Sequence, residues 1–129
     1  MTRLIQDGSM GKTGFIQDHE LYTPEQDGKA LELASLIEEK QLKTVRIVWP
    51  DQHGILRGKH ISAKDFSSVL RNGIDFQTAT LFMDTSNALI APIFDANAGL
   101  NFTELAGGPD SILVPDPSTF KILPWADST

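Results

Sequence analysis

The spacing of apolar residues separates helical from extended parts of the chain. From Thr23 to Gln41 the apolar positions recur with helical spacing, which predicts an amphipathic helix with Thr23 as N-cap and Pro24 at its first position. Its expected buried face consists of Ala30, Leu33, Ala34 and Ile37. Residues 1–22 are polar and glycine-rich and show no such period. We therefore expect a mobile or loosely docked arm at 1–22 and a folded domain at 23–129.

A different pattern follows, in which apolar and other residues alternate. This alternation predicts a strand at Thr44–Trp49 and a returning strand at Ile55–Ile61, joined by the tight link Asp-Gln-His-Gly at 51–54. Ser62 and Asp65 then form an S-x-x-D pattern that is typical of a helix start. The predicted helix has a buried stripe and ends at glycine, at the positions Phe66, Val69, Leu70 and Gly73.

The last part of the sequence has weaker patterns. Residues Phe76–Met83 favour a strand or an extended loop, and most of 84–108 is rich in Asn, Ala and Gly and favours loop. Two short strands are predicted at Ile112–Val114 and Phe120–Leu123, on either side of a Pro-Asp-Pro-Ser turn. The order of helix, hairpin, helix and further strands predicts an α+β fold. A small mixed sheet with a helix packed on one face is the layout of a β-grasp domain.

Composition narrows the classes of partner. A length of 129 residues supports one domain, and the net charge of −6 argues against a nucleic-acid partner. The absence of cysteine excludes disulfides and thiolate sites, and the three histidines lack metal-site spacing. No apolar run approaches the roughly 20 residues of a membrane span, and no signal peptide is apparent. We expect a cytoplasmic protein without a membrane partner and without a metal site of its own.

Candidate chemistry is sparse when the residues are taken alone. The segment Arg57-Gly58-Lys59 concentrates positive charge that could meet a phosphate or a carboxylate, although a solvated strand face is the favoured interpretation. His53 is expected to be exposed in the hairpin turn. Five aspartates fall at predicted turns, where the side chain commonly bonds the nearby backbone: Asp51, Asp84, Asp95, Asp110 and Asp116. No catalytic centre is recognisable.

Residues 33–129 as a whole resemble the N-terminal β-grasp domain of the glutamine synthetase superfamily. The likeness is carried by VRIVWPDQHGILRGKHI at 45–61, by DFQTATLFMD at 75–84 and by PDSILVPDPSTFKILPWADST at 109–129, together with the helix that ends at Asn72-Gly73. The third segment is the most specific, because its D-x-x-L-x-P-D-x-S-T core is hard to obtain by chance. The R-G-K strand is more similar to the glutamine synthetase-like γ-glutamyl-amine ligases than to the typical ammonia-using enzymes.

The resemblance implies that this domain acts within a larger ligase. Such a parent would be a ring-shaped homo-oligomer, for which we expect a dodecamer. Its catalytic domain would bind ATP, glutamate and Mg or Mn, and ammonia or an amine would displace phosphate from the activated γ-carboxylate of glutamate. The sequence holds none of the catalytic-domain signatures. We therefore expect this chain alone to bind no cofactor, to be inactive, and to contribute subunit contacts and one loop to the neighbouring subunit's active site.

That loop reads F-D-G-S-S in ammonia-using members, whose aspartate helps to bind ammonium. Aligning Phe76 with its phenylalanine places Gln77 at the aspartate. We name Phe76–Thr80 the amine-side loop, and the resemblance implies substrate-binding roles for Phe76, Gln77, Thr78 and Thr80, with Ala79 between them. A one-residue slip would use Asp75 instead, but it loses the phenylalanine match and the spacing to Leu81.

The replacement of the aspartate by Gln77 has a physical consequence. A carboxylate about 4 Å from ammonium is worth on the order of 4 kcal/mol at an effective dielectric constant of 20. A neutral amide gives up most of that attraction, although its oxygen still accepts a hydrogen bond. We therefore predict that the parent enzyme uses a larger amine, such as a polyamine, an aryl amine or an alkyl amine. The alternative is that Gln77 only packs in the loop and another residue recruits ammonia.

A function of another class also stays open. The chain could be a free-standing β-grasp interaction module, similar to ubiquitin, that presents a sheet edge to a protein partner. Its last residues, Ala126–Thr129, are not the Gly-Gly tail expected of a conjugated modifier. A regulatory paralogue that has lost catalysis is a further alternative within the family.

Overall fold

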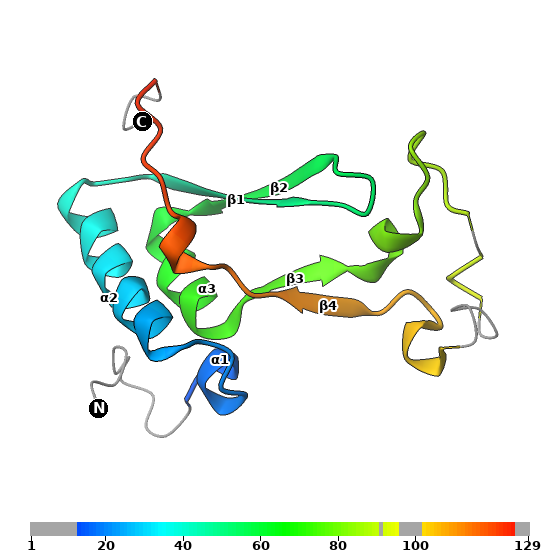
Figure 1. The fold of residues 1–129 in the computed structure, drawn as a ribbon, viewed down its shortest axis with the longest axis horizontal. Coiled ribbons are helices and arrows are strands. Elements are labelled where there is room, and N and C mark those ends of the chain that lie inside the picture. The colour runs from blue at the N-terminus through cyan, green and yellow to red at the C-terminus, as the bar shows by residue number, and fades with distance from the viewer. Residues whose placement is uncertain (1–12, 91, 96–101, 126–129) are drawn as a thin grey trace. The chain divides into compact units, whose positions relative to one another are not determined.

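The structure, a computed structural model, describes residues 13–90, 92–95 and 102–125. The α-helices and strands in these ranges are α1 (Phe15–Asp18), α2 (Pro24–Glu39), β1 (Thr44–Pro50), β2 (Leu56–Ser62), α3 (Phe66–Asn72), β3 (Ile74–Gln77) and β4 (Asp110–Leu113) (Figure 1). Short 3₁₀ helices complete the set: η1 (Ala63–Asp65), η2 (Thr78–Phe82), η3 (Thr103–Leu105) and η4 (Pro117–Thr119). The predicted α+β class is confirmed.

The described strands form two separate two-stranded sheets, where the sequence suggests one small mixed sheet. One sheet is the β1–β2 hairpin, and the other pairs β3 with β4 in antiparallel register, from Ile74 opposite Leu113 to Gln77 opposite Asp110. This arrangement is consistent with a small β-grasp-like domain. The strand predicted at Phe120–Leu123 is wrong, since these residues are irregular. Ile122 is 48% exposed there, so the segment has no well-buried apolar face that would favour strand pairing.

The chain divides into two compact units, which we describe separately. The helical unit comprises the residues up to Ile47, His60–Gly73 and those from Val114 on, within the described ranges. The loop unit comprises Val48–Lys59 and Ile74–Leu113. The β1–β2 hairpin therefore contributes its base to the helical unit and its tip to the loop unit.

Helix α2 begins as its sequence predicts. The Thr23 Oγ1 atom accepts a hydrogen bond from the Gln26 backbone N–H at 3.3 Å, and the Gln26 Oε1 atom accepts from the Thr23 N–H at 3.0 Å. This reciprocal pair is a capping box, which satisfies two N–H groups that the helix itself leaves unbonded. The predicted apolar face is confirmed, with Ala34 less buried than the other three positions: Ala30, Leu33 and Ile37.

Helix α3 begins later than predicted. The Ala63 N–H donates to the Lys43 carbonyl at 2.8 Å, so strand-like pairing continues past Ser62 and a 3₁₀ turn precedes the helix. Neither Ser62 nor Asp65 makes a side-chain capping bond, and the predicted S-x-x-D cap is wrong. The predicted buried stripe and the end of the helix are confirmed, at Phe66, Val69, Leu70 and Gly73, the last of which has φ of +72°.

Part of the N-terminal segment packs within the helical unit. Helix α1 contacts α3, and both are labelled in Figure 1. Ile16 of α1 is buried, and the Phe15 N–H donates to Asn72 Oδ1 at 3.2 Å at the end of α3. The Tyr22 hydroxyl donates to the Pro115 carbonyl at 2.7 Å, close to η4. Residues 1–12 of the predicted arm lie outside the described residues. The domain boundary at residue 22 stays a prediction.

The loop unit has a small apolar core of its own. Ala79, Phe82 and Ile93 are buried together, with Leu105 packed against them. Residues Phe76–Met83, for which the sequence leaves strand and loop open, are a strand only as far as Gln77 and then turn into η2. A tightly wound 3₁₀ segment has poorer hydrogen-bond geometry than a strand or an α-helix. Other contacts must therefore hold this part of the chain.

Candidate functional site

Three of the five residues in the amine-side loop are buried within the loop unit. The Phe76 ring contacts the Trp49 ring edge-on, with centroids 5.5 Å apart and an interplanar angle of 89°. Thr78 is 1% exposed, and both its backbone N–H, at 3.2 Å, and its hydroxyl donate to the Pro109 carbonyl. Ala79 lies in the apolar core. These three residues shape the loop and offer few groups to a ligand.

Gln77 is the exposed polar side chain of the amine-side loop. It ends β3, whereas Thr80 is half-buried and donates its hydroxyl to the Gln77 carbonyl at 3.1 Å. Asp75 is also exposed, two residues earlier and so on the same side of the strand. Both residues of the two alternative alignments are therefore available at the surface, and the substrate-binding roles stay predictions.

The strand register brings a further carboxylate to the loop. The predicted turn position of Asp110 is wrong, because this residue begins strand β4. Asp110 lies directly opposite Gln77 in the β3–β4 pair and is exposed. The Cβ atoms of such directly opposed residues are about 4.5–5.5 Å apart. The spacing of two short strands in the sequence does not give their register, so nothing in the sequence alone connects Asp110 with the loop. The immediate surroundings of Gln77 are therefore acidic.

The hairpin turn beside the loop is organised around Asp51. Its Oδ1 atom accepts hydrogen bonds from the backbone N–H groups of His53 and Ile55, both at 2.9 Å, and Gly54 adopts a φ of +75°. Its Oδ2 atom accepts from Arg57 Nε at 3.0 Å and forms an ion pair with Arg57 Nη2 at 2.9 Å. Burial alone would raise the Asp51 pKa, but the bonds from Ile55, His53 and Arg57 outweigh it and lower the pKa. The carboxylate is therefore ionised and structural.

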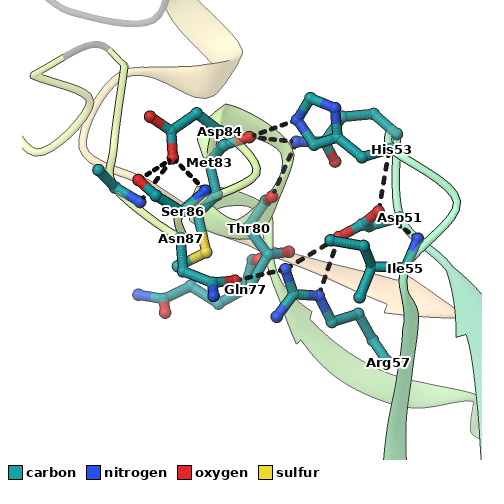
Figure 2. A network of polar contacts seen from close by, with 12 residues as sticks. Asp51, His53, Ile55, Arg57, Gln77, Thr80, Met83, Asp84, Ser86 and Asn87 are labelled. Atoms are coloured by element: carbon teal, nitrogen blue, oxygen red, sulfur yellow. Dashed lines mark hydrogen bonds and ion pairs between the residues drawn. The ribbon is translucent and has the colours of Figure 1, made fainter.

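Side chains of this turn donate to the segment that follows the amine-side loop (Figure 2). Gln52 Nε2 donates to the Met83 carbonyl at 2.7 Å and to the Thr80 carbonyl at 3.3 Å. His53 is exposed, as predicted, and its Nε2 atom lies 3.0 Å from the Met83 carbonyl. Arg57 Nη2 donates to Asn87 Oδ1 at 2.7 Å. Segments that are distant in sequence thus meet through polar contacts.

The positive charges of the R-G-K segment are engaged within the unit. Arg57 is bonded to Asp51 and Asn87, with a side chain that is only 26% exposed, and the predicted solvated strand face is wrong for this residue. The Lys59 ammonium donates to the Asp75 carbonyl. The alternation along β2 places both side chains on its less exposed face.

A second aspartate turn follows the loop. Asp84 Oδ1 accepts from the Ser86 N–H at 2.8 Å, the Ser86 hydroxyl at 2.7 Å and the Ala88 N–H at 3.0 Å. The Ser86 hydroxyl and then the Ala88 N–H lower the Asp84 pKa, against a smaller opposing effect of burial. The predicted role of turn aspartates in bonding the nearby backbone is confirmed here, as it is for Asp51 and Asp116.

Two further observations limit the chemistry of the site. Within residues 13–90, 92–95 and 102–125, no group of three or more histidine or acidic side chains could hold a metal ion. Among the helices in these ranges, none has the length and apolar character needed to cross a lipid bilayer.

Comparison with known sequences identifies the family of this chain. The chain is 35% identical to a γ-glutamylanilide synthase from Acinetobacter over 92% of its own length, and 30% identical to a glutamate–isopropylamine ligase from Pseudomonas over 77%. It is also 34% identical over 63% of its length to a type-1 glutamine synthetase from Dictyostelium discoideum. No family model matches the chain. The chain belongs to the glutamine synthetase superfamily.

The resemblance to the N-terminal domain of the glutamine synthetase superfamily is thereby confirmed. The chain spans only 24%, 20% and 14% of these three relatives. Human lengsin is a further relative, 28% identical over 84% of the chain. The activity, substrates and assembly of a glutamine synthetase-like parent are therefore matters for a proposal.

Proposed function

We propose that this chain is the N-terminal domain of an ATP-dependent ligase that forms a γ-glutamyl amide from glutamate and an amine. The support is that the three relatives compared above are named as ligases or synthases of this kind. In this proposal the domain contributes contacts to neighbouring subunits of a ring-shaped homo-oligomer, a dodecamer, and lends its amine-side loop to a neighbour's active site. A free-standing interaction module has no comparable support among these relatives.

The amine in this proposal is larger than ammonia. The observation that carries this step is the exposed, neutral Gln77 at the end of β3, where the resemblance implies an aspartate in ammonia-using enzymes. One relative is named for γ-glutamylanilide, which is an amide of aniline, and another is named for isopropylamine. Aniline and isopropylamine are both organic amines. A neutral amide accepts a hydrogen bond from an N–H group but attracts a small cation far less than a carboxylate does.

In this proposal the exposed Asp110, opposite Gln77, helps to attract the amine. Its carboxylate would attract any protonated amine, ammonium included, so the preference for a larger amine in this proposal rests on Gln77 as a neutral hydrogen-bond acceptor. Asp75 would have the stronger claim only in the alternative alignment, in which it replaces the family's aspartate. Substitution of each carboxylate separately distinguishes these roles.

The ATP and the Mg or Mn ions of the parent would be held elsewhere. The described residues offer no ligand cluster for a metal, so the groups present here do not fit that role. We assign no step of the reaction to ATP or metal on this chain. The proposed contribution of the domain is limited to binding and orienting the amine and to contacts between subunits.

Steady-state kinetics of the full-length parent test the proposal directly. Ammonium, isopropylamine, aniline and a polyamine would each be varied at saturating glutamate and ATP. We expect at least one organic amine to give a kcat/KM about tenfold or more above that of ammonium, a difference of about 1.4 kcal/mol. A clear preference for ammonium would overturn the proposed amine class, and formation of no γ-glutamyl amide would overturn the ligase itself.

Substitution of the loop sharpens this test. Gln77→Asp should raise kcat/KM for ammonium about tenfold, because a carboxylate replaces a neutral acceptor. Asp75→Asn should change the ammonium value little if the preferred alignment is correct, and abolish most of it if the slipped alignment is correct. Gln17→Asp, on an exposed position of α1, is the matched control for added charge.

A further inference from the structure

Two side chains of the β1–β2 hairpin, one from its turn and one from strand β2, donate to backbone carbonyls at the two ends of the amine-side loop. At its beginning, the Lys59 ammonium donates to the carbonyl of Asp75, the residue directly before the loop. At its end, Gln52 Nε2 donates to the carbonyl of Thr80, the last residue of the loop, and to that of Met83. All of these residues belong to the loop unit.

The hairpin tip is well built for this purpose. Asp51 joins the two sides of the turn by accepting from the backbone at Ile55 and from the Arg57 guanidinium, and its side chain is only 4% exposed. Gly54 supplies the left-handed backbone conformation that closes the turn. Gln52 therefore belongs to a turn that several hydrogen bonds to the Asp51 carboxylate hold in place. Figure 2 shows these contacts of Asp51 with His53, Ile55 and Arg57.

The first part of the loop backbone is fixed by the pairing of β3 with β4 and by the two bonds from Thr78 to the Pro109 carbonyl. From Thr78 onward the loop is a 3₁₀ helix, whose internal hydrogen bonds have poor geometry. Its apolar anchors are Phe76, against one tryptophan, and Ala79, in a small cluster. Gln52 therefore adds a contact at the Thr80 end of the loop, beyond the residues that β4 and Pro109 hold.

We propose that Gln52 and Lys59 are positioning residues that hold the two ends of the amine-side loop and so fix where Gln77 is presented to the amine. We call these contacts of Gln52 and Lys59 with the two ends of the loop the bracket. Its effect on catalysis rests on the proposed function, whereas its existence is a structural claim that can be tested separately. Neither side chain needs to touch the substrate.

The chemistry of the two donors suits their acceptors. A glutamine amide carries two N–H donors and can satisfy two carbonyls at once, as Gln52 does. Replacement by glutamate would keep the size of the side chain, but it would remove both donors and direct negative charge at carbonyl oxygens. Lys59→Met would likewise keep most of the length and remove the donor.

Hydrogen–deuterium exchange in the full-length parent tests the bracket without using activity. We expect Gln52→Ala to speed amide exchange in residues 78–84 about fivefold, the effect of one net hydrogen bond of about 1 kcal/mol. Gln52→Glu should act at least as strongly. Exchange in residues 24–39 should stay unchanged, and the controls Gln17→Ala and Gln17→Glu should leave residues 78–84 as in the wild type. Unchanged exchange in either Gln52 variant would overturn the inference.

Kinetics then separate positioning from general damage. In Gln52→Ala and Lys59→Met we expect KM for the organic amine to rise about threefold or more, a change of at least about 0.7 kcal/mol, while KM for glutamate and ATP stays as in the wild type. Lys64→Met, at an exposed lysine of η1, is the control for Lys59→Met. An equal rise in all three KM values would contradict a specific positioning role.

The two proposals fail in distinguishable ways. If the wild-type parent forms no γ-glutamyl amide, the proposed function is overturned, and the exchange experiment, with Lys59→Met measured over residues 74–77 beside the Gln52 variants, alone decides whether the bracket exists. If the parent is active and the Gln52 variants exchange as the wild type does, the bracket is overturned and the proposed function stands.

Discussion

The helical unit and the loop unit are stabilised by different kinds of contact. In the helical unit, α2 and α3 bury apolar side chains at helical spacing, among them Leu33 and Leu70. In the loop unit the apolar cluster is small, and side-chain donors such as Gln52 and Arg57 hold the backbone turns. A repeating apolar pattern in the sequence therefore predicts stabilisation by apolar burial, but it does not predict stabilisation by side-chain hydrogen bonds. The region that carries the candidate site depends on contacts that no such pattern reveals.

One motif nevertheless recurs in both units. Asp84 and Asp116 each accept hydrogen bonds from the backbone N–H and the hydroxyl of the serine two residues later. The hydroxyl distance is 2.7 Å in both cases, and the N–H distances are 2.8 and 3.0 Å. Asp-x-Ser thus forms the same local turn in two different surroundings.

The largest effect that we predict falls on the helical core. Leu70→Ala should lower the free energy of unfolding by about 3 kcal/mol, because Leu70 is 2% exposed and its truncation leaves a cavity. Urea denaturation followed by circular dichroism would measure it. Leu56→Ala, at a strand position that is 73% exposed, should cost less than about 0.5 kcal/mol. Similar losses in the two variants would contradict the apolar account of this unit.

A smaller effect is expected from a polar group in the loop unit. Thr78→Val keeps the shape of the side chain but removes the hydroxyl that donates to the Pro109 carbonyl in a buried position. We expect a loss of about 1–2 kcal/mol in the free energy of unfolding. Thr85→Val, at an exposed position, is the matched control. Stabilisation by Thr78→Val would show that apolar packing governs this unit as well.

The helix cap of α2 should contribute less again. Thr23→Ala removes the Oγ1 acceptor for the Gln26 N–H, and we expect a cost of about 1 kcal/mol. Thr23→Ser keeps an acceptor at the same place and should restore most of the stability. Urea midpoints of the three proteins would decide the matter, and an equal loss in both variants would rule out the capping account.

The same contrast explains how far the sequence predicts the structure. The α2 and α3 cores follow from apolar spacing, and the ends at Thr23 and Gly73 follow from local capping chemistry. The predicted cap at Ser62 is wrong because the long-range bond from the Ala63 N–H to the Lys43 carbonyl keeps the chain extended there. Long-range bonds of this kind are set by the tertiary fold, and local propensity does not determine them.

For the candidate site, the sequence supplies the residues but not their arrangement. The resemblance identifies Gln77 as the notable position of the loop, yet its neighbour Asp110 emerges only from the β3–β4 register. The donors from Gln52 and Lys59 lie many residues away from the carbonyls that accept from them. Exposed turn and strand residues have many possible partners, and nothing in the spacing selects among them.

The smallest predicted effect compares the two Asp-x-Ser turns under acid conditions. The serine hydroxyls are the largest cause of the lowered pKa values of Asp84 and Asp116. An aspartate whose pKa is lower in the folded state stabilises that state above its ordinary pKa of about 3.9, and the contribution is lost as the pH falls through the lowered value.

Ser86→Ala and Ser118→Ala should each move the folded pKa of the adjacent aspartate back toward its ordinary value. Each variant should therefore be less stable than the wild type at pH 7, and should lose less stability on acidification. Carboxyl NMR titration of Asp84 and Asp116, with urea midpoints at neutral and acid pH, would measure both effects, and Ser67→Ala on the exposed part of α3 is the control. Equal pKa shifts of Asp84 and Asp116 would mean that the serine contributes the same amount in both turns. A larger shift at one site would mean that a partner from outside the turn contributes there, since the charge of His53 also lowers the Asp84 pKa and the Gln26 amide also lowers the Asp116 pKa.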